Sequence, residues 1–184
     1  MMSDKVEQDT NKWTWHPSPL IGQIILVTTM DGDGIENVST KSWVSMAAFN
    51  PPVLSFGCNL RHRTAMNVMA TREFVVNVPG SDLIEKSWQL AEKPPPRSLE
   101  QVGLTGQPAI KVKPRRIMEC RAHFECLLDS WKAWGDEIIF FGHITSYSMD
   151  KGMLAGDHLD RYERLGIPVY LEEKIYGVVT ARRI

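Results

Sequence analysis

The chain has 184 residues, and its 21 lysine and arginine residues are balanced by 22 aspartate and glutamate residues, so its formal net charge is −1. This balance argues against nucleic-acid binding through bulk positive charge. Hydrophobic residues make up 43% of the chain and charged residues 23%, a composition typical of folded globular proteins and not of disordered ones. The length suits one well-packed domain, which should bury roughly 70% of the surface that its unfolded chain exposes.

The sequence predicts neither a membrane span nor a secretory signal. The longest stretch without a charged residue, 42–60, is interrupted by serines, asparagine and the pair Pro51-Pro52. The N-terminus is polar and mixed in charge, which differs from the apolar run of a signal peptide, and we expect a cytoplasmic protein. The odd cysteine count, Cys58, Cys120 and Cys126, contains no Cys-x-x-Cys pair and predicts buried, reduced thiols.

The first half of the chain has strand character after an N-terminal arm, 1–17, whose Trp13 and Trp15 predict an extended, anchored entry. Residues 21–30 are rich in isoleucine, valine and threonine and predict a strand. Two Asp-Gly pairs in 31–34 then indicate a hairpin into a strand over 35–45. The break at Asn50-Pro51-Pro52 precedes a third strand, which we expect over 53–58.

Two helices and a further strand follow. Apolar residues at helical spacing predict a helix over 63–70, and the run 74–78 returns to strand character. Ser81 is a candidate N-cap of a second helix, which carries Trp88 and ends before Pro94-Pro95-Pro96. We expect the chain after these prolines to make a surface excursion, with a helical turn around 98–102 and no strand.

The second half adds β-like stretches over 117–128 and 137–147, joined by a loop, and two short ones over 169–171 and 175–180. Strands outnumber helices, and few helices lie between consecutive strands, which disfavours a parallel doubly wound sheet. The sequence therefore predicts a mainly β fold, an antiparallel barrel with a few peripheral helices.

Standard catalytic and metal-binding patterns are missing. The chain has no Gly-x-Ser-x-Gly, His-Glu-x-x-His, Walker loop or Gly-x-Gly-x-x-Gly after a strand, and its five histidines lack ligand spacing. We therefore predict no metal site and no catalytic dyad, and we expect each histidine to have a core or surface role.

A polar cluster lies in two neighbouring predicted strands, 37–45 (NVSTKSWVS) and 55–64 (SFGCNLRHRT). The second segment runs through a turn into the start of a helix, where backbone N–H groups, hydroxyls and arginines together could bind a phosphate. The alternative is a solvated edge strand beside an ordinary helix N-terminus, with Ser55 and Thr64 as capping groups and Arg61 and Arg63 in water. The residues alone leave both interpretations open.

These segments resemble the flavin reductase-like family, whose members bind FMN on a split β-barrel of antiparallel, Greek-key type. The resemblance extends over residues 18–148 and is carried by five ordered motifs: Asn37-x-Ser39-Thr40-x-Ser42-x-x-Ser45, Asn50-Pro51-Pro52-Val53-Leu54-Ser55-Phe56-Gly57-Cys58, His62-Arg63-Thr64-Ala65-x-Asn67, Glu73-Phe74-Val75-Val76-Asn77-Val78 and Gly135-Asp136-x-Ile138-Ile139-Phe140-Phe141-Gly142. It implies a split-barrel domain over 18–150 and a C-terminal extension over 151–184 that packs on the barrel or on a dimer partner.

The resemblance also implies a homodimer with FMN near the subunit interface. Ser39, Thr40, Ser42 and Ser45 would face the flavin ring or ribityl chain, and Ser55, Arg63 and Thr64 would hold the phosphate. Cys58 and Asn59 would be neighbours of the cofactor. The implied cofactor-binding set is completed by Asn37, Lys41, Trp43, Phe56 and Gly57.

The implied activity is that of an oxidoreductase in which NAD(P)H passes hydride to FMN, so the protein supplies position and polarity. Glu137 departs from the Gly-Asp-His of many nicotinamide-using relatives, and a carboxylate there would repel an anionic dinucleotide. The alternative is therefore a flavoredoxin-type electron carrier with tightly bound FMN. A flavin-dependent monooxygenase or a redox protein would be the partner, and a related barrel that binds haem or a pyridoxal-type phosphate is a third possibility.

Overall fold

The computed structural model describes residues 5–7, 9–12 and 20–184. The arm that we expected to be anchored by Trp13 and Trp15 therefore falls partly outside the described residues. A seven-stranded sheet forms the body of the molecule, in the order β3-β2-β6-β9-β10-β5-β4, and every neighbouring pair in it is antiparallel. Its strands are β2 (Ile25–Met30), β3 (Glu36–Lys41), β4 (Val44–Phe49), β5 (Pro52–Asn59), β6 (Glu73–Val78), β9 (Ala122–Trp134) and β10 (Glu137–Met149).

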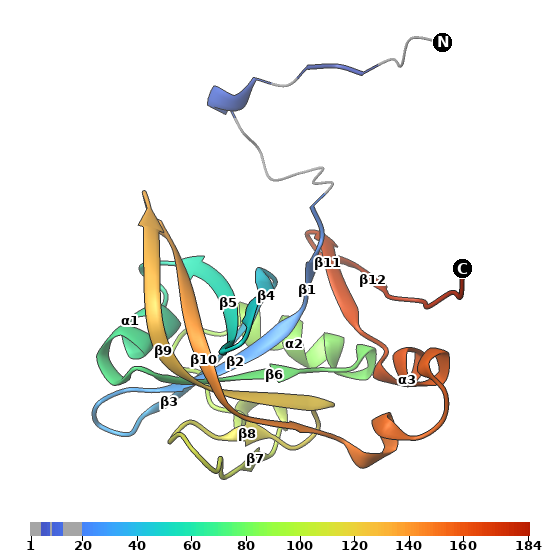
Figure 1. Cartoon of the computed structure of the whole chain (residues 1–184). Helices are drawn as coiled ribbons and strands as arrows, with labels where there is room; N and C mark the ends of the chain where they lie inside the picture. Colours follow the sequence, from blue (N-terminus) through green and yellow to red (C-terminus); the bar gives the residue numbers. More distant parts are fainter. Residues whose placement is uncertain (1–4, 8, 13–19) are drawn as a thin grey trace.

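Smaller elements surround this sheet, which curls so that the long β9–β10 ribbon rises beside β4 and β5 (Figure 1). A three-stranded sheet joins β1 (Gly22–Gln23), β11 (Pro168–Glu172) and β12 (Ile175–Val178), and a two-stranded one joins β7 (Gly106–Gln107) and β8 (Arg116–Ile117). The helices are α1 (Arg63–Thr71), α2 (Ile84–Glu92) and α3 (His158–Leu165), with 3₁₀ turns at Thr10–Lys12, Ser81–Leu83, Glu100–Val102 and Lys151–Leu154. Among the described residues, no helix is both long and apolar enough to cross a membrane.

Alternation along β2 explains why the barrel has helices outside it. Ile25 and Val27 point into the barrel core, where the Phe56 ring lies 5.1 Å from that of Phe74. Leu26, between them, belongs to a second buried cluster with Leu90 of α2 and with residues of the segment that follows this helix. Because successive side chains of a strand point to opposite faces, both faces of β2 need cover, and α2 supplies part of it. The predicted mainly β, antiparallel split-barrel class is confirmed.

Several predictions of local structure were wrong. The surface excursion expected after the proline run to lack a strand contains β7, and its Leu99 and Leu104 are buried. The strand expected over 35–45 is two strands, because the chain breaks at Ser42 and Trp43 and moves from one edge of the sheet to the other. The Ser42 carbonyl oxygen lies 1.8 Å from where a Cβ of Gly22 would stand, so the backbone at this break approaches Gly22 more closely than any other residue would allow.

The loop expected over 129–136 is also wrong, because β9 continues to Trp134 and β10 starts at Glu137. A turn at Gly135 and Asp136 is enough, since Gly135 adopts a positive φ of 58°. Trp131 and Trp134 are consequently strand residues near the tip of a long ribbon.

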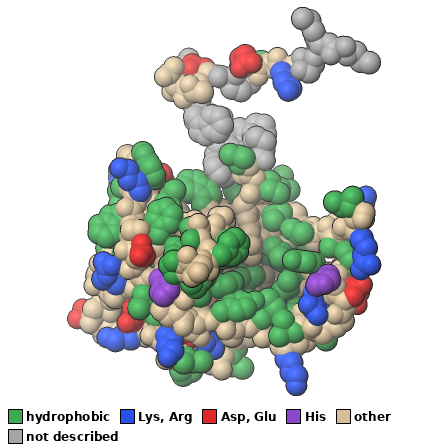
Figure 2. All heavy atoms as spheres, in the orientation of Figure 1, with side chains coloured by type: hydrophobic (Ala, Val, Ile, Leu, Met, Phe, Trp, Pro, Cys, Tyr) green, Lys and Arg blue, Asp and Glu red, His purple; other side chains and the backbone are tan. Residues whose placement is uncertain are grey.

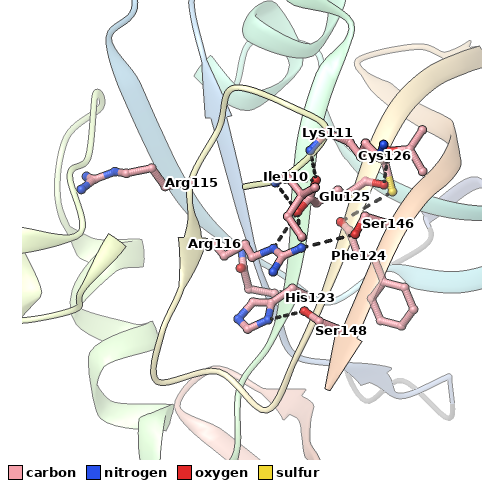
Figure 3. A network of polar contacts seen from close by, with 12 residues as sticks. Ile110, Lys111, Arg115, Arg116, His123, Phe124, Glu125, Cys126, Ser146 and Ser148 are labelled. Carbon is pink, nitrogen blue, oxygen red and sulfur yellow. Dashed lines mark hydrogen bonds and ion pairs between the residues drawn. The ribbon is translucent and has the colours of Figure 1, made fainter. Parts of the chain in front are cut away.

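A buried ion pair fixes the loop that precedes β8 (Figure 3). Glu125 of β9 is fully buried and accepts hydrogen bonds from the backbone N–H groups of Ile110 (2.9 Å) and Lys111 (2.6 Å). Arg116 of β8 donates to the same carboxylate through Nε at 2.6 Å and to the Ser146 hydroxyl at 3.3 Å. One carboxylate therefore joins β8, β9 and an exposed loop.

Candidate functional site

A cleft with two compartments lies between the end of β3 and helix α2. The first, about 270 Å³, is bordered by Ser39, Arg61, His62, Arg63, Thr64 and Arg97 and is called here the cationic compartment. The second, about 190 Å³, is bordered by Ile24, Ser42, Ile84, Ser87, Trp88 and Tyr170 and is called here the aromatic compartment. Thr40, Lys41 and Ala91 border both. The cleft can therefore receive an elongated ligand with an anionic end and a planar end.

Two positive charges of the cationic compartment have no ion-pair partner among the described residues, and Glu137 acts on one of them, Lys41, only from a longer distance. Arg61 is paired with Asp136 at 3.1 Å, and Arg63 is paired with Asp31. Lys41 and Arg97, by contrast, have no carboxylate within ion-pair distance in the described part of the chain. A phosphate dianion would balance these two charges and form charge-assisted hydrogen bonds with them.

Burial affects the ionisation of the groups around this compartment. It lowers the pKa of Lys41, and repulsion from Arg97 lowers it further. Burial also lowers the pKa of His62, whose Nδ1 lies 3.3 Å from Lys41 Nζ. A neutral imidazole therefore accepts a hydrogen bond from the lysine ammonium at neutral pH.

Hydroxyl groups and a helix start complete this compartment. The Ser39 and Thr64 hydroxyl oxygens lie 2.6 Å apart, which joins β3 to the first turn of α1. The N-cap residue of α1, His62, makes no side-chain hydrogen bond to the backbone N–H groups of the first turn. The start of a helix of this kind favours a bound anion.

Arg97 reaches the compartment because β3 holds its backbone. The Arg97 N–H donates to Asn37 Oδ1 at 3.2 Å, and the Val38 N–H donates to the Arg97 carbonyl at 2.9 Å. Sequence reasoning missed Arg97 because we expected only a surface excursion after the proline run. No local pattern could have identified it, since its partners lie sixty positions earlier.

The aromatic compartment is closed by α2 and by the C-terminal ribbon. Thr40 Oγ1 donates to the Ser87 carbonyl at 2.7 Å and joins β3 to α2. Tyr170 of β11 lies opposite Gly22 of β1, and its ring centroid is 6.0 Å from that of Trp88. Sequence reasoning assigned neither Trp88 nor Tyr170 to a ligand, because the helix and the C-terminal strand looked like ordinary packing elements.

Two buried nitrogen atoms in this cleft have no hydrogen-bond partner. They are Nε of Arg63, at the cationic end, and Nε1 of Trp88, at the aromatic end. Because a buried donor without an acceptor is costly, a ligand oxygen or nitrogen that reached either atom would stabilise the complex. A flavin phosphate carries acceptors at both ends, in its phosphate group and along the polar edge of its ring, so the donor set of the cleft fits this class of ligand.

The structure brings part of the predicted residue set to the cleft. Ser39, Thr40, Lys41, Ser42, Arg63 and Thr64 border it. Asn37 is fully buried behind it, where it donates to Thr64 Oγ1 at 3.4 Å, and Gly57 lies under the Trp43 ring, where a Cβ would come within 2.8 Å of that ring.

Other predicted residues lie elsewhere. The Ser55 hydroxyl, expected at the phosphate, donates to the Ser45 carbonyl at 3.4 Å between β5 and β4. Ser45 borders a cavity at the mouth of the barrel instead. Phe56 and Cys58 are buried in the barrel core. These four residues do not border the cleft, and their assignment as cofactor contacts stays a prediction.

Glu137 lies beside the cleft but does not border it. It starts β10 opposite Asn59, whose side-chain N–H₂ donates to Glu137 Oε1 at 3.2 Å. Asn59 Oδ1 in turn accepts the Arg61 backbone N–H at 2.9 Å. The carboxylate that replaces the expected histidine is thus held in place at the turn that carries the arginines.

The model of the flavin reductase like domain matches residues 18–166. The chain belongs to this family. An uncharacterized protein of Aquifex aeolicus is 31% identical over 145 residues, which cover 75% of this chain and 74% of that protein. The residues that the family model matches include the seven-stranded sheet and every cleft residue except Tyr170.

Solved structures share the fold of this chain. Nitrilotriacetate monooxygenase component B from Bacillus cereus has a TM-score of 0.88 at 18% identity, with 99% of both chains covered. Flavoredoxin of Desulfovibrio vulgaris has a TM-score of 0.82 at 16% identity, covering 97% of this chain and 96% of that one. An FMN-binding protein from Thermus thermophilus has a TM-score of 0.81 at 13% identity, with 98% of both covered. At these identities the likeness shows a shared fold.

Proposed function

We propose that this flavin reductase-like protein binds FMN in the cleft and is an oxidoreductase that accepts hydride from NAD(P)H and passes on the reducing equivalents. The observation that carries this proposal is the placement of two cations without an ion-pair partner in the described residues, Lys41 and Arg97, next to a compartment with an aromatic wall. A phosphate dianion fits the first part and a planar ring fits the second. The FMN-binding protein of the same fold supports this choice of flavin.

Each part of the cleft has a task in this proposal. Lys41 and Arg97 bind the phosphate, and the hydroxyls of Ser39 and Thr64 orient it. Thr40 borders both compartments, where the ribityl chain passes, and Ser42 borders the aromatic compartment beside it. The bound FMN would supply the redox chemistry itself, which explains why the chain needs no acid-base pair. The protein positions the ring and restricts the access of water.

Glu137 supports a second candidate function, an electron carrier of the flavoredoxin type with tightly bound FMN. Asn59 holds its carboxylate beside the arginine-bearing turn, where it would oppose the approach of an anionic dinucleotide. The flavoredoxin of the same fold agrees with this alternative. The two candidates differ in one measurable property, the reduction of the flavin by NADH or NADPH.

We also propose that the protein is a homodimer. Exposed hydrophobic side chains occur on β4 and the β9–β10 ribbon, including Phe49 (85% exposed), Trp134 (58%) and Tyr147. Hydrophobic side chains cover much of the face in Figure 2 over these strands, while lysine and arginine lie mainly toward its margins. Contiguous apolar surface of this kind favours a protein interface. We propose a second copy as the partner on this surface, in agreement with the homodimer that the family resemblance implies.

A flavin-dependent monooxygenase is the proposed acceptor, or a redox protein if the carrier function holds. The component B of the same fold supports the first choice. The proposed compartment is the cytoplasm, which agrees with the three cysteines being free and buried.

The test starts from the visible spectrum of the purified protein, with and without added FMN, followed by anaerobic titration with NADH and NADPH. An oxidised flavin spectrum that is bleached repeatedly by either nucleotide supports the reductase. A stable flavin spectrum that only a chemical reductant bleaches favours the carrier. A protein that stays colourless and does not bind added FMN would contradict both candidates.

A further inference from the structure

The aromatic compartment contains an indole N–H that nothing in the fold uses. Trp88 borders this compartment from α2, and its Nε1 is buried without a hydrogen-bond partner. Most buried polar groups have partners, so an exception of this kind needs an explanation. Three other side-chain nitrogens in the described residues share this state, and one of them, Arg63 Nε, belongs to the same cleft.

The surroundings of Trp88 limit what could satisfy its N–H. The compartment is bordered by the apolar Ile24 and Ile84, and its hydroxyl groups are already committed in part, since Ser87 Oγ donates to the Leu83 carbonyl at 2.9 Å. The missing partner is therefore an acceptor on the ligand. A planar ring with oxygen or nitrogen acceptors along one edge would supply both the apolar face and the acceptor.

Tyr170 explains why the indole stays in this position. The Tyr170 ring packs at 60° to the Trp88 ring. The segment that carries Tyr170, residues 166–174, is fixed to the body of the protein at three places. The Ile24 N–H donates to the Pro168 carbonyl at 2.9 Å, the Ser81 N–H donates to the Gly166 carbonyl at 2.9 Å, and Lys174 pairs with Glu92 at 2.8 Å. Tyr170 lies outside the residues matched by the family model, 18–166.

We propose that the Trp88 indole N–H donates a hydrogen bond to an acceptor atom on the ring edge of the bound flavin, and that Tyr170 is a positioning residue that holds the indole at the wall of the aromatic compartment. This inference rests on the proposed function and deepens it. It gives the C-terminal ribbon a part in recognising the ring. Nε1 is shielded in the ligand-free structure, so the proposed contact requires the indole to turn toward the compartment when the flavin binds.

The ring contact can be separated from the phosphate contacts by comparing FMN with riboflavin, which has the same ring and no phosphate. Trp88→Phe should weaken the binding of both flavins by about three- to tenfold and leave the ratio of their dissociation constants unchanged. Tyr170→Ala should show the same pattern, with a smaller effect for Tyr170→Phe. Gln89→Ala, an exposed neighbour on α2 that does not border the cleft, is the matched control and should bind both flavins as the wild type does.

A direct readout uses protein labelled with [15N]tryptophan. The Trp88 indole signal, assigned by its loss in Trp88→Phe, should shift on saturation with riboflavin and equally with FMN. If that variant does not fold, the signal is assigned in the wild type through its contacts with the Tyr170 ring. An indole signal that does not move, or a folded Trp88→Phe protein with unchanged affinity, would overturn the inference while flavin binding by the wild type stands. A wild type that binds neither flavin would overturn the proposed function as well.

Discussion

Asn37 on β3 and Arg97 after helix α2 hold each other through a backbone-to-side-chain contact, Arg97 N–H to Asn37 Oδ1 at 3.2 Å. The same asparagine donates through Nδ2 to Thr64 Oγ1 at 3.4 Å, so one fully buried amide joins the arginine segment to the first turn of α1. The two compartment walls that would face a phosphate are therefore connected through a single side chain. Replacing only the arginine side chain should change binding without disturbing this connection.

Arg97→Ala should weaken FMN binding by about 10- to 100-fold, because it removes a charge-assisted contact with the phosphate. In this variant Lys41 is the remaining cation of the cationic compartment that has no ion-pair partner in the described residues. Riboflavin binding should change little, since riboflavin has no phosphate. The measurement is a pair of fluorescence titrations, one for each flavin. Arg183→Ala is the control, because Arg183 is exposed, is already paired with Asp157 and does not border the cleft. An equal loss of affinity for both flavins would mean that the phosphate lies elsewhere.

The preference for FMN over riboflavin should decrease at alkaline pH. Burial and repulsion from Arg97 lower the pKa of Lys41 below its usual 10.5, so the free protein loses this charge at a lower pH than an exposed lysine would. A bound phosphate favours the charged lysine and raises its pKa again. Binding therefore takes up protons between the two pKa values, and FMN affinity falls as pH rises through this window.

This pH effect is measured as the dissociation constant of riboflavin divided by that of FMN, from about pH 7 to about pH 10. Both flavins carry the same ring, so the titration of the ring cancels in this ratio. Lys41→Gln should give a lower ratio that no longer depends on pH over this range. A constant wild-type ratio would show that Lys41 does not contact the phosphate.

Local patterns in the sequence predicted the elements that form the cleft but not the way it closes. The Asp-Gly pairs after Met30 and the helix from Arg63 depend on neighbouring residues, and both were correctly predicted. The single strand expected over 35–45 was wrong, and its break lies against the backbone of the distant Gly22. Arg97 and Tyr170 reach the cleft through tertiary contacts, which leave no periodic signal in a single sequence.

The three cysteines should be unreactive in the folded protein. Burial raises the pKa of Cys58 to about 11, although the nearby Lys41 opposes this shift, and it also raises the pKa values of Cys120 and Cys126. The thiolate is the reactive form, so little of it exists at pH 8. Ellman's reagent at this pH should detect no rapidly reacting thiol in the native protein and all three thiols in denaturant. One rapidly reacting thiol in the native protein would show that a cysteine is more accessible than its place in the core indicates.

Glu125→Gln should destabilise the fold by about 3–5 kcal/mol, because it leaves the buried guanidinium of Arg116 without a counter-charge. It also weakens the acceptor for two backbone N–H groups of the loop before β8. The free energy of unfolding is measured by urea titration with flavin absent, so that ligand binding does not contribute.

Arg183→Ala is the matched control, since Arg183 and Asp157 form an exposed pair that should contribute less than about 1 kcal/mol. The double variant Glu125→Leu with Arg116→Met should be less destabilised than Glu125→Gln, because it removes both charges rather than stranding one. Leucine removes the loop contacts altogether and glutamine only weakens them, so a double variant that is still the more stable of the two assigns the larger cost to the unpaired charge. A double variant that is as unstable as the single one would mean that the carboxylate acts mainly by holding the loop, and that its pairing with Arg116 contributes little.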